Sequence, residues 1–249
     1  WTWLVLMLIK FLQVGAIVGL VSVLLNMAFP GLSDFWWLII VVIAISSIVV
    51  SGYYKILEVL SVSMIGLFTI FTFFSLIALQ STESAISIAN ITSGLQFQIP
   101  EGAGMAIVVI GAFGLTGVGG DEIMAYNYWL IEKGYASNTG QNDGTEEWNR
   151  RAKGWIKVMY IDAIFAMIVY TLVTVAFFLL GSALLYGKGD FNVGGKAFLE
   201  DLSNLYTATL GGWAEPFFYF GAFVVLFSTA FSALGAWTRQ FTDAFGRVG

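Results

Sequence analysis

The chain of 249 residues is 58% hydrophobic, and only 11% of its residues are Asp, Glu, Lys or Arg. Soluble domains carry about 25% charged residues, so lipid rather than water must solvate most of this chain. It has no cysteine and no histidine, which excludes a disulfide framework, a thiolate or imidazole metal site and a cysteine nucleophile. The formal charge of −5 comes mostly from the connections and does not indicate nucleic acid or another charged partner.

Six apolar segments are expected to cross a bilayer, for which a helix needs about 20 residues. The first ends at the helix-stop signal Pro30-Gly31, and short polar connections join the first three. Longer polar segments separate the others. The expected spans are residues 4–29, 35–50, 55–79, 104–131, 160–185 and 213–236. The sequence therefore predicts an all-α, multi-pass integral membrane protein.

The fourth span is interrupted by glycine. Its first apolar part, residues 104–116, would make only about 20 Å of helix, which is short of a hydrocarbon core of about 30 Å. A glycine-rich run at 117–120 follows, and apolar sequence resumes at Ile123. Two half-length pieces would cross the membrane together, which predicts a broken helix with its break near 117–122.

The basic residues are divided unequally between the two sides that six crossings define. Lys188 and Lys196 fall on one side, and the remaining Lys and Arg residues fall on or near the other. Cytoplasmic loops carry the excess of Lys and Arg, so residues 132–153 are expected in the cytoplasm and residues 80–103 and 186–212 outside. The sequence opens within an apolar run and closes just after one, so we expect it to be part of a longer protein.

Acidic residues within spans are candidates for function, because a charge at mid-membrane costs roughly 2.5–3.5 kcal/mol on insertion scales. Asp121 and Glu122 lie in the glycine break, and Asp162 lies near the start of the fifth span. A break frees backbone carbonyls and lets neighbouring carboxylates converge, and such oxygen ligands suit magnesium, calcium or manganese. Discontinuous helices also mark substrate sites in secondary transporters. We therefore expect a divalent-cation site at Gly120, Asp121 and Glu122.

Other interpretations of these residues stay open. The glycines could serve only the close packing of helices, and Asp162 could form an interfacial ion pair, for example with Lys157. Tyr126 and Asn127 follow the acids on the second half-helix, where either could contact the site or simply pack.

The whole chain resembles the Nramp family of divalent metal transporters, particularly its bacterial branch of Nramp-related magnesium transporters. The resemblance is carried by residues 117–122 (GVGGDE), 128–134 (YWLIEKG) and 157–163 (KVMYIDA). It implies the inverted-repeat (LeuT-like) transporter fold, with this chain covering roughly helices three to eight and its broken helix as the sixth. It also implies a bacterial inner-membrane protein whose partners are lipid and a divalent metal ion, with no cofactor and no enzymatic activity.

Family members bind metal between broken first and sixth helices, and the sixth-helix motif Ala-x-x-Met-Pro-His corresponds here to residues 120–125. In this register Ile123 stands where the family has methionine and Ala125 where it has histidine. A shift of one residue would instead place Met124 at the sulfur position. The neighbouring carboxylates favour the first register and hence Mg²⁺ or Mn²⁺ as the transported substrate.

The family's proton route uses acids on its third helix, where this chain has Gln13. The resemblance therefore implies transport without proton coupling, with Gln13 and Asp162 as candidates for supporting or gating the site. An amino-acid or sodium symporter of the same fold is an alternative, although Asp121 and Glu122 would repel a carboxylate substrate. An intramembrane aspartyl protease is another, but Asp162 follows the glycine motif instead of preceding it.

Overall fold

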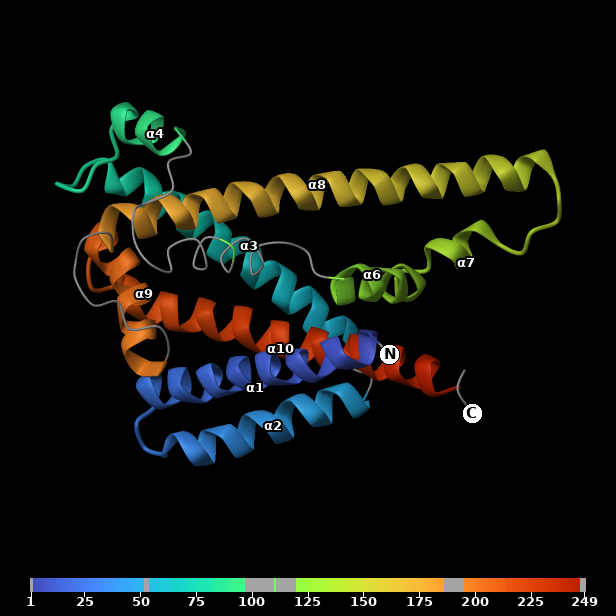
Figure 1. Ribbon diagram of the computed structural model, residues 1–249, viewed down its shortest axis with the longest axis horizontal. Helices are drawn as coiled ribbons and strands as arrows, with labels where there is room; N and C mark the ends of the chain where they lie inside the picture. Colours follow the sequence, from blue (N-terminus) through green and yellow to red (C-terminus); the bar gives the residue numbers. More distant parts are fainter. Residues whose placement is uncertain (1, 52–53, 97–109, 111–119, 186–194, 247–249) are drawn as a thin grey trace. The chain divides into compact units, whose positions relative to one another are not determined.

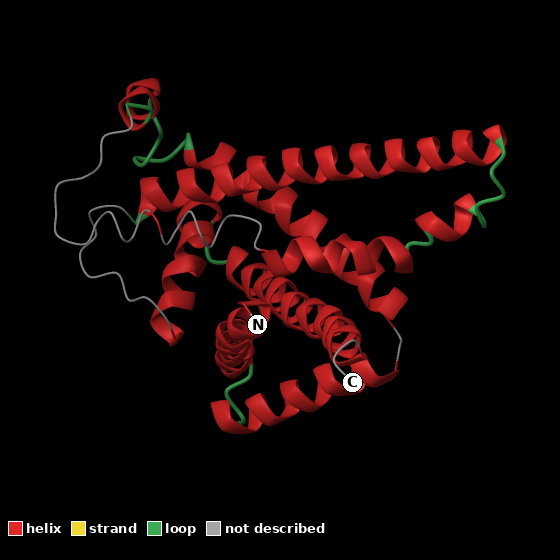
Figure 2. Cartoon of the chain, turned by 45° about the vertical axis from the view of Figure 1, so that its right-hand side comes forward, coloured by secondary structure: helices red, strands yellow, loops and turns green. Residues whose placement is uncertain are grey.

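The computed structural model describes residues 2–51, 54–96, 110, 120–185 and 195–246 (Figure 1). Every regular element in these ranges is an α-helix, as Figure 2 shows, so the expectation of an all-α chain is confirmed for them. The helices are α1 (Thr2–Ala28), α2 (Asp34–Ser51), α3 (Tyr54–Leu79), α4 (Ile88–Gly94), α6 (Gly120–Glu132), α7 (Tyr135–Thr139), α8 (Glu146–Leu184), α9 (Gly195–Leu210) and α10 (Ala214–Gly246).

Several helices have the length and composition of membrane spans. Among the described residues, four helices are long and apolar enough to cross a membrane, and a shorter apolar stretch covers Ile65–Leu79 of α3. The four segments are Met7–Ala28, Asp34–Ser51, Glu146–Leu184 and Ala214–Gly246. Their outer surfaces are apolar: Leu12 is 76% exposed and Phe178 72% exposed. Water would make such surfaces costly and lipid does not, so the chain is a multi-pass helical membrane protein.

Helices also occupy segments that the sequence analysis treats as connections. Helix α8 begins at Glu146, well before the expected crossing at about residue 160, and α9 lies within the expected outer connection. Polar side chains support these extensions, because ion pairs one turn apart stabilise a helix without any apolar run. Two such pairs are Glu147–Arg151 at 3.3 Å and Lys196–Glu200 at 3.5 Å. Apolar length marks a crossing, whereas the helix itself can continue beyond it.

Of the segment expected to hold the broken crossing, the structure describes Ile110 and the residues from Gly120 onward. Helix α6 begins at Gly120, inside the expected break at 117–122. Residues 117–119 lie outside the described ranges, so the break stays a prediction.

The chain divides into two compact units, to which α8 and α10 each contribute on both sides of the division. The first unit comprises Trp1–Ile86 and Ala176–Gly235, and the second comprises Ser87–Val175 and Ala236–Gly249. In the first unit, α1 packs against α2 and α9, and α9 also packs against α3. The core of this unit includes Leu24, Leu79, Leu180, Leu199, Tyr206 and Phe218.

Tyr206 of α9 lies at the centre of this core and is fully buried. Its ring stacks on Phe71 with centroids 5.3 Å apart, and its hydroxyl oxygen lies 3.0 Å from Thr72 Oγ1. The single hydroxyl proton of Thr72 goes to the Phe68 carbonyl at 2.9 Å, so Tyr206 is the donor to Thr72. Burial raises the pKa of Tyr206 well above its usual value, so the hydroxyl stays protonated and able to donate.

Helix α10 meets α3 at a glycine. A Cβ atom placed on Gly221 would lie only 2.8 Å from Cε2 of Phe68, and closer still to its neighbour Cδ2. Real Cβ atoms do not approach other atoms so closely, so the absence of a side chain at Gly221 is what lets the Phe68 ring lie there.

Candidate functional site

The expected metal-binding residues lie in the first turn of α6. Gly120 is the first residue of the helix, followed by Asp121 and Glu122. The Glu122 side chain is exposed, whereas the Asp121 side chain lies outside what the structure describes. Acidic residues at a helix N-terminus are stabilised by the helix dipole, which favours the ionised carboxylates that a cation needs. The same dipole disfavours a cation there, so binding of a metal would depend on the carboxylates.

The structure leaves the metal site itself untested. Among the described residues, no three His, Cys, Asp or Glu side chains come together. The Asp121 carboxylate and residues 117–119, on which the prediction depends, are not among them. The candidate contacts Ile123, Met124 and Asn127 are exposed on α6.

Tyr126 is the expected site residue that points inward. It is half-buried, and its hydroxyl is buried with no hydrogen-bond partner among the described residues. It lies four residues after Glu122 and therefore on the same face of α6. The charges of Asp162 and Lys133 act on this phenol, so it borders a polar region within the second unit.

Asp162 of α8 forms an ion pair with Lys133, the residue after α6, with 3.1 Å between Lys133 Nζ and Asp162 Oδ2. The sequence suggested Lys157 as the partner of Asp162, but the structure gives Lys133 instead. Burial by itself would lower the pKa of Lys133, but the hydrogen bond and charge of Asp162 outweigh it and raise this pKa. Lys133 thus stays protonated and ties the end of α6 to α8.

The end of α6 also contacts the last turns of α10, through a group of residues that we call the α6–α10 clamp. The Tyr128 hydroxyl donates to Asp243 Oδ2 at 2.6 Å, and Glu132 forms an ion pair with Arg239. The Arg239 guanidinium also lies 5.5 Å from the centre of the Trp129 ring. The two contacts are four residues apart on each helix, and the order of the partners is reversed between the helices. Both contacts therefore fit the same antiparallel alignment of α6 and α10.

The clamp could not be predicted from the sequence. Its signal in the sequence is a pair of polar residues four positions apart on each of two apolar helices. The pairs are Tyr128 and Glu132 on α6, and Arg239 and Asp243 on α10. That pattern shows that each helix has a polar stripe, but not that the two stripes face each other.

Gln13, the candidate for supporting or gating the site, is exposed on α1. It belongs to the first unit, whereas Glu122 and Asp162 belong to the second.

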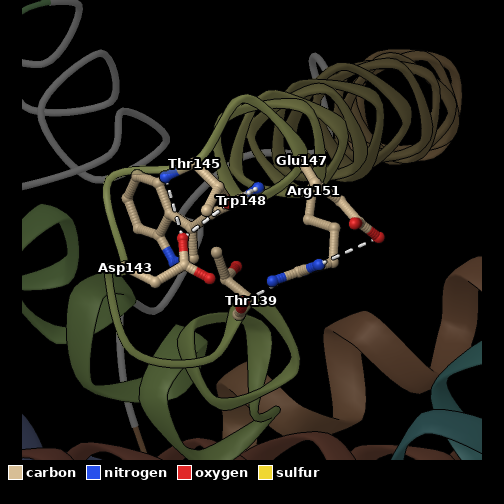
Figure 3. A network of polar contacts seen from close by, with 6 residues as sticks. All are labelled: Thr139, Asp143, Thr145, Glu147, Trp148 and Arg151. Carbon is tan, nitrogen blue, oxygen red and sulfur yellow. Dashed lines mark hydrogen bonds and ion pairs between the residues drawn. The ribbon is translucent and has the colours of Figure 1, made fainter.

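A polar network fixes the start of α8 (Figure 3). Thr145 caps the helix by accepting a hydrogen bond from the Trp148 amide at 3.1 Å. Asp143 in turn accepts from the Thr145 amide at 2.9 Å and from its hydroxyl at 2.6 Å. These two hydrogen bonds lower the pKa of Asp143 below its usual value. Trp148 Nε1 donates to the Gly140 carbonyl at 3.0 Å, which closes the loop onto the helix.

Comparison with known proteins gives two matches of different extent. A Pasteurella multocida (strain Pm70) protein described as uncharacterized is 31% identical over 122 residues, which cover 47% of this chain and 24% of that protein. The aligned part is thus about a quarter of that relative's length. No solved structure matches the chain significantly. The family model for natural resistance-associated macrophage protein-like (Nramp) proteins matches residues 1–247, nearly the whole chain, and the chain therefore belongs to the Nramp family.

Proposed function

We propose that the protein containing this chain transports a divalent metal cation across a membrane. The observation that carries the proposal is the Nramp match over residues 1–247. Transporters of this family use no cofactor, and the divalent metal is their substrate. Family membership favours neither the symporter nor the protease alternative. The apolar exteriors of the long helices agree with a transporter that lies in the bilayer.

The transported ion in this proposal is Mg²⁺ or Mn²⁺, bound at Gly120, Asp121 and Glu122 in an inverted-repeat fold of a bacterial inner membrane. Two adjacent carboxylates and freed carbonyls would supply hard oxygen ligands, and the 249 residues contain no cysteine or histidine to supply softer ones. Transport proceeds without proton coupling in this proposal, since Gln13 replaces an acid and no histidine is present to carry protons.

The test is uptake of Mg²⁺ and of Mn²⁺ into liposomes containing the full-length protein, with a pH-sensitive dye inside. Asp121→Asn and Glu122→Gln should each lower uptake at least about tenfold, the low end of the loss seen for residues that merely support metal ligands. The internal pH should not follow the metal. Asp34→Asn is the matched control, because Asp34 is an exposed acid in the first turn of α2.

Each negative result would contradict a different part of this proposal. If neither ion enters, the transport assignment is wrong. If both acidic variants transport as well as the parent, the metal lies elsewhere and the glycines serve packing. If Met124→Ala lowers only Mn²⁺ uptake, Met124 and not Ile123 stands at the family's sulfur position. Metal-driven acidification of the liposomes would contradict uncoupled transport.

A further inference from the structure

Helix α8 changes character along its length. Its first part carries Glu146, Glu147, Arg150, Arg151, Lys153, Lys157 and Asp162, whereas no residue from Ala163 to Leu184 is charged. The uncharged part is about 33 Å long at 1.5 Å per residue, which matches a hydrocarbon core of about 30 Å. The expected crossing begins near residue 160, so the charged part of this continuous helix stands at and above one membrane surface.

Arg150, Lys153 and Lys157 form what we call the basic face of α8. Their spacings of three and four residues place them on one side of the helix, and all three are exposed. Within the described ranges, none of the three side chains forms an ion pair or a hydrogen bond. Arg151, on the same turn, differs: it pairs with Glu147 at 3.3 Å and donates to the Thr139 carbonyl at 3.4 Å. The basic face thus carries three positive charges that form no ion pair with the chain's described residues.

The height of the basic face matches the surface of a membrane. Measured along the helix from residue 160, Lys157 lies about 5 Å, Lys153 about 11 Å and Arg150 about 15 Å away. Headgroups extend roughly 5–8 Å beyond the hydrocarbon core, and the Debye length adds about 8 Å at physiological salt. All three charges therefore lie where an anionic surface is felt. A hollow lined by Glu146, Asn149, Arg150 and Lys153 opens beside them.

We propose that the basic face binds the phosphates of anionic phospholipids, so that the protein gathers such lipids around α8. The positive charge on the face complements the headgroup phosphate, and the uncharged remainder of the same helix keeps the face at the bilayer surface. The proposal needs only that α8 crosses a membrane, and it is independent of which substrate the protein transports.

Gly154 offers a reporter beside the basic face. It lies between Lys153 and Lys157 in sequence, and a Cβ atom there would meet nothing within 4 Å. The 249 residues contain no cysteine, so Gly154→Cys places one fluorophore within them, any cysteine elsewhere in the full-length protein being replaced by serine. The labelled protein is reconstituted in phosphatidylcholine vesicles containing either phosphatidylglycerol or phosphatidylcholine that is spin-labelled near its headgroup. The ratio of quenching by the two lipids measures local enrichment of the anionic one.

Phosphatidylglycerol should quench more strongly than phosphatidylcholine, and the enrichment should weaken as salt is raised. The combined variant Arg150→Gln, Lys153→Gln and Lys157→Gln should lower the enrichment at least about fivefold, since each basic residue near an anionic surface attracts anionic lipid. Arg151→Gln is the matched control and should change it less than about twofold, because Arg151 is already paired with Glu147.

Three outcomes would overturn the proposal. Equal quenching by both lipids in the protein with an intact basic face would show that it selects no anionic lipid, and this result requires no charge substitution. Unchanged enrichment in the combined variant would place any selectivity elsewhere. Loss of enrichment on adding inorganic phosphate, but not sodium chloride of equal ionic strength, would assign the face to a free anion.

Discussion

At the scale of single residues, the buried Tyr206–Thr72 hydrogen bond has a direction that mutation can test. Thr72→Val leaves the Tyr206 hydroxyl buried without an acceptor and should cost about 1–3 kcal/mol. Tyr206→Phe leaves Thr72 bonded to the Phe68 carbonyl and should cost only about 0.5–1.5 kcal/mol. Thermal unfolding in detergent measures both.

Ser75→Ala is the control for this pair. The Ser75 hydroxyl is buried without a hydrogen-bond partner among the described residues, so its removal should leave stability unchanged or raise it. A larger loss for Tyr206→Phe than for Thr72→Val would reverse the assigned donor and acceptor.

Single-residue chemistry was accessible from the sequence, whereas partners were not. Asp162 stood out because an acid near the start of an apolar run is rare. Its partner Lys133 lies 29 residues earlier, on the far side of a turn and a loop. The sequence offered Lys157 as a nearby basic residue, but closeness along the chain does not show which side chains meet, and the position of α6 beside α8 is set by packing.

Among the elements, the cap of α8 should depend on pH. The folded-state pKa of Asp143 is lowered relative to the ordinary value for Asp, which is about 4. The contribution of the Asp143 carboxylate to stability is therefore fully present above about pH 4 and is lost as the pH falls through the lowered pKa. Thr145→Ala should remove about 1 kcal/mol of capping and also weaken this pH dependence, because the Thr145 hydroxyl donates to the Asp143 carboxylate. The midpoint of thermal unfolding of the parent and both variants, taken across this pH range, is the measurement.

Asp143→Ala serves as the comparison for the pH effect. The parent should converge on this variant as pH falls below 4, because protonation and deletion remove the same charge. A stability gap between parent and Asp143→Ala that is independent of pH would show that the Asp143 charge does not matter.

The contact of α10 with α3 should fail if Gly221 gains a side chain. Gly221→Ala places its Cβ against the Phe68 ring, which itself packs on Tyr206 with centroids 5.6 Å apart and so cannot move alone. Overpacking of this kind costs about 1–3 kcal/mol. Gly66→Ala on α3 is the matched control, because nothing lies within 4 Å of its added carbon. Thermal unfolding should separate the two, and equal midpoints would mean that the Phe68 ring yields freely.

The α6–α10 clamp should show coupling between its charged partners. Glu132→Gln and Arg239→Gln each break the same ion pair, so the double variant should lose less than the sum of the single losses. Both side chains are partly exposed, which limits the coupling to about 0.2–1 kcal/mol. A double-mutant cycle on unfolding midpoints measures it, and strictly additive losses would argue against the pair.

A helix could be predicted from the sequence where an apolar run is long. An amphipathic helix such as α9 could not be recognised in this way. Helix α9 was expected to be a polar connection, yet it buries Leu199, Ser203 and Tyr206 against the first unit. Those positions recur every three or four residues, which is a helical pattern. The average composition of α9 hides this pattern, because most of its residues are polar or small and burial against protein needs only one apolar face.

For the whole molecule, membership in a helical membrane family followed from composition and from a few motifs, but the number of crossings did not. Length and apolar composition mark four helices as spans in the part of the chain that the structure describes. The crossing expected at 104–131 is predicted as two pieces, neither long enough by itself, so no rule based on length can identify it. Helix α6, with 13 residues, illustrates the difficulty, since it would reach only about 20 Å.

Cysteine labelling can decide whether segment 104–131 crosses. Ser81 and Gln141 are exposed on either side of it, and the 249 residues contain no cysteine, so Ser81→Cys and Gln141→Cys each give one reactive thiol in them. Six crossings place these two thiols on opposite sides, with Gln141 in the cytoplasm because of the basic residues around it. In intact cells an impermeant maleimide should therefore label Ser81→Cys and not Gln141→Cys.

Asn204→Cys on α9 completes this test, because it is exposed and follows α8. Its thiol should react like that of Ser81→Cys if both the broken segment and α8 cross. Equal labelling of Ser81→Cys and Gln141→Cys, with Asn204→Cys on the opposite side, would mean that α8 crosses and segment 104–131 does not. The acids of α6 would then lie at one surface, and the midplane cation site proposed for Asp121 and Glu122 would have to be abandoned.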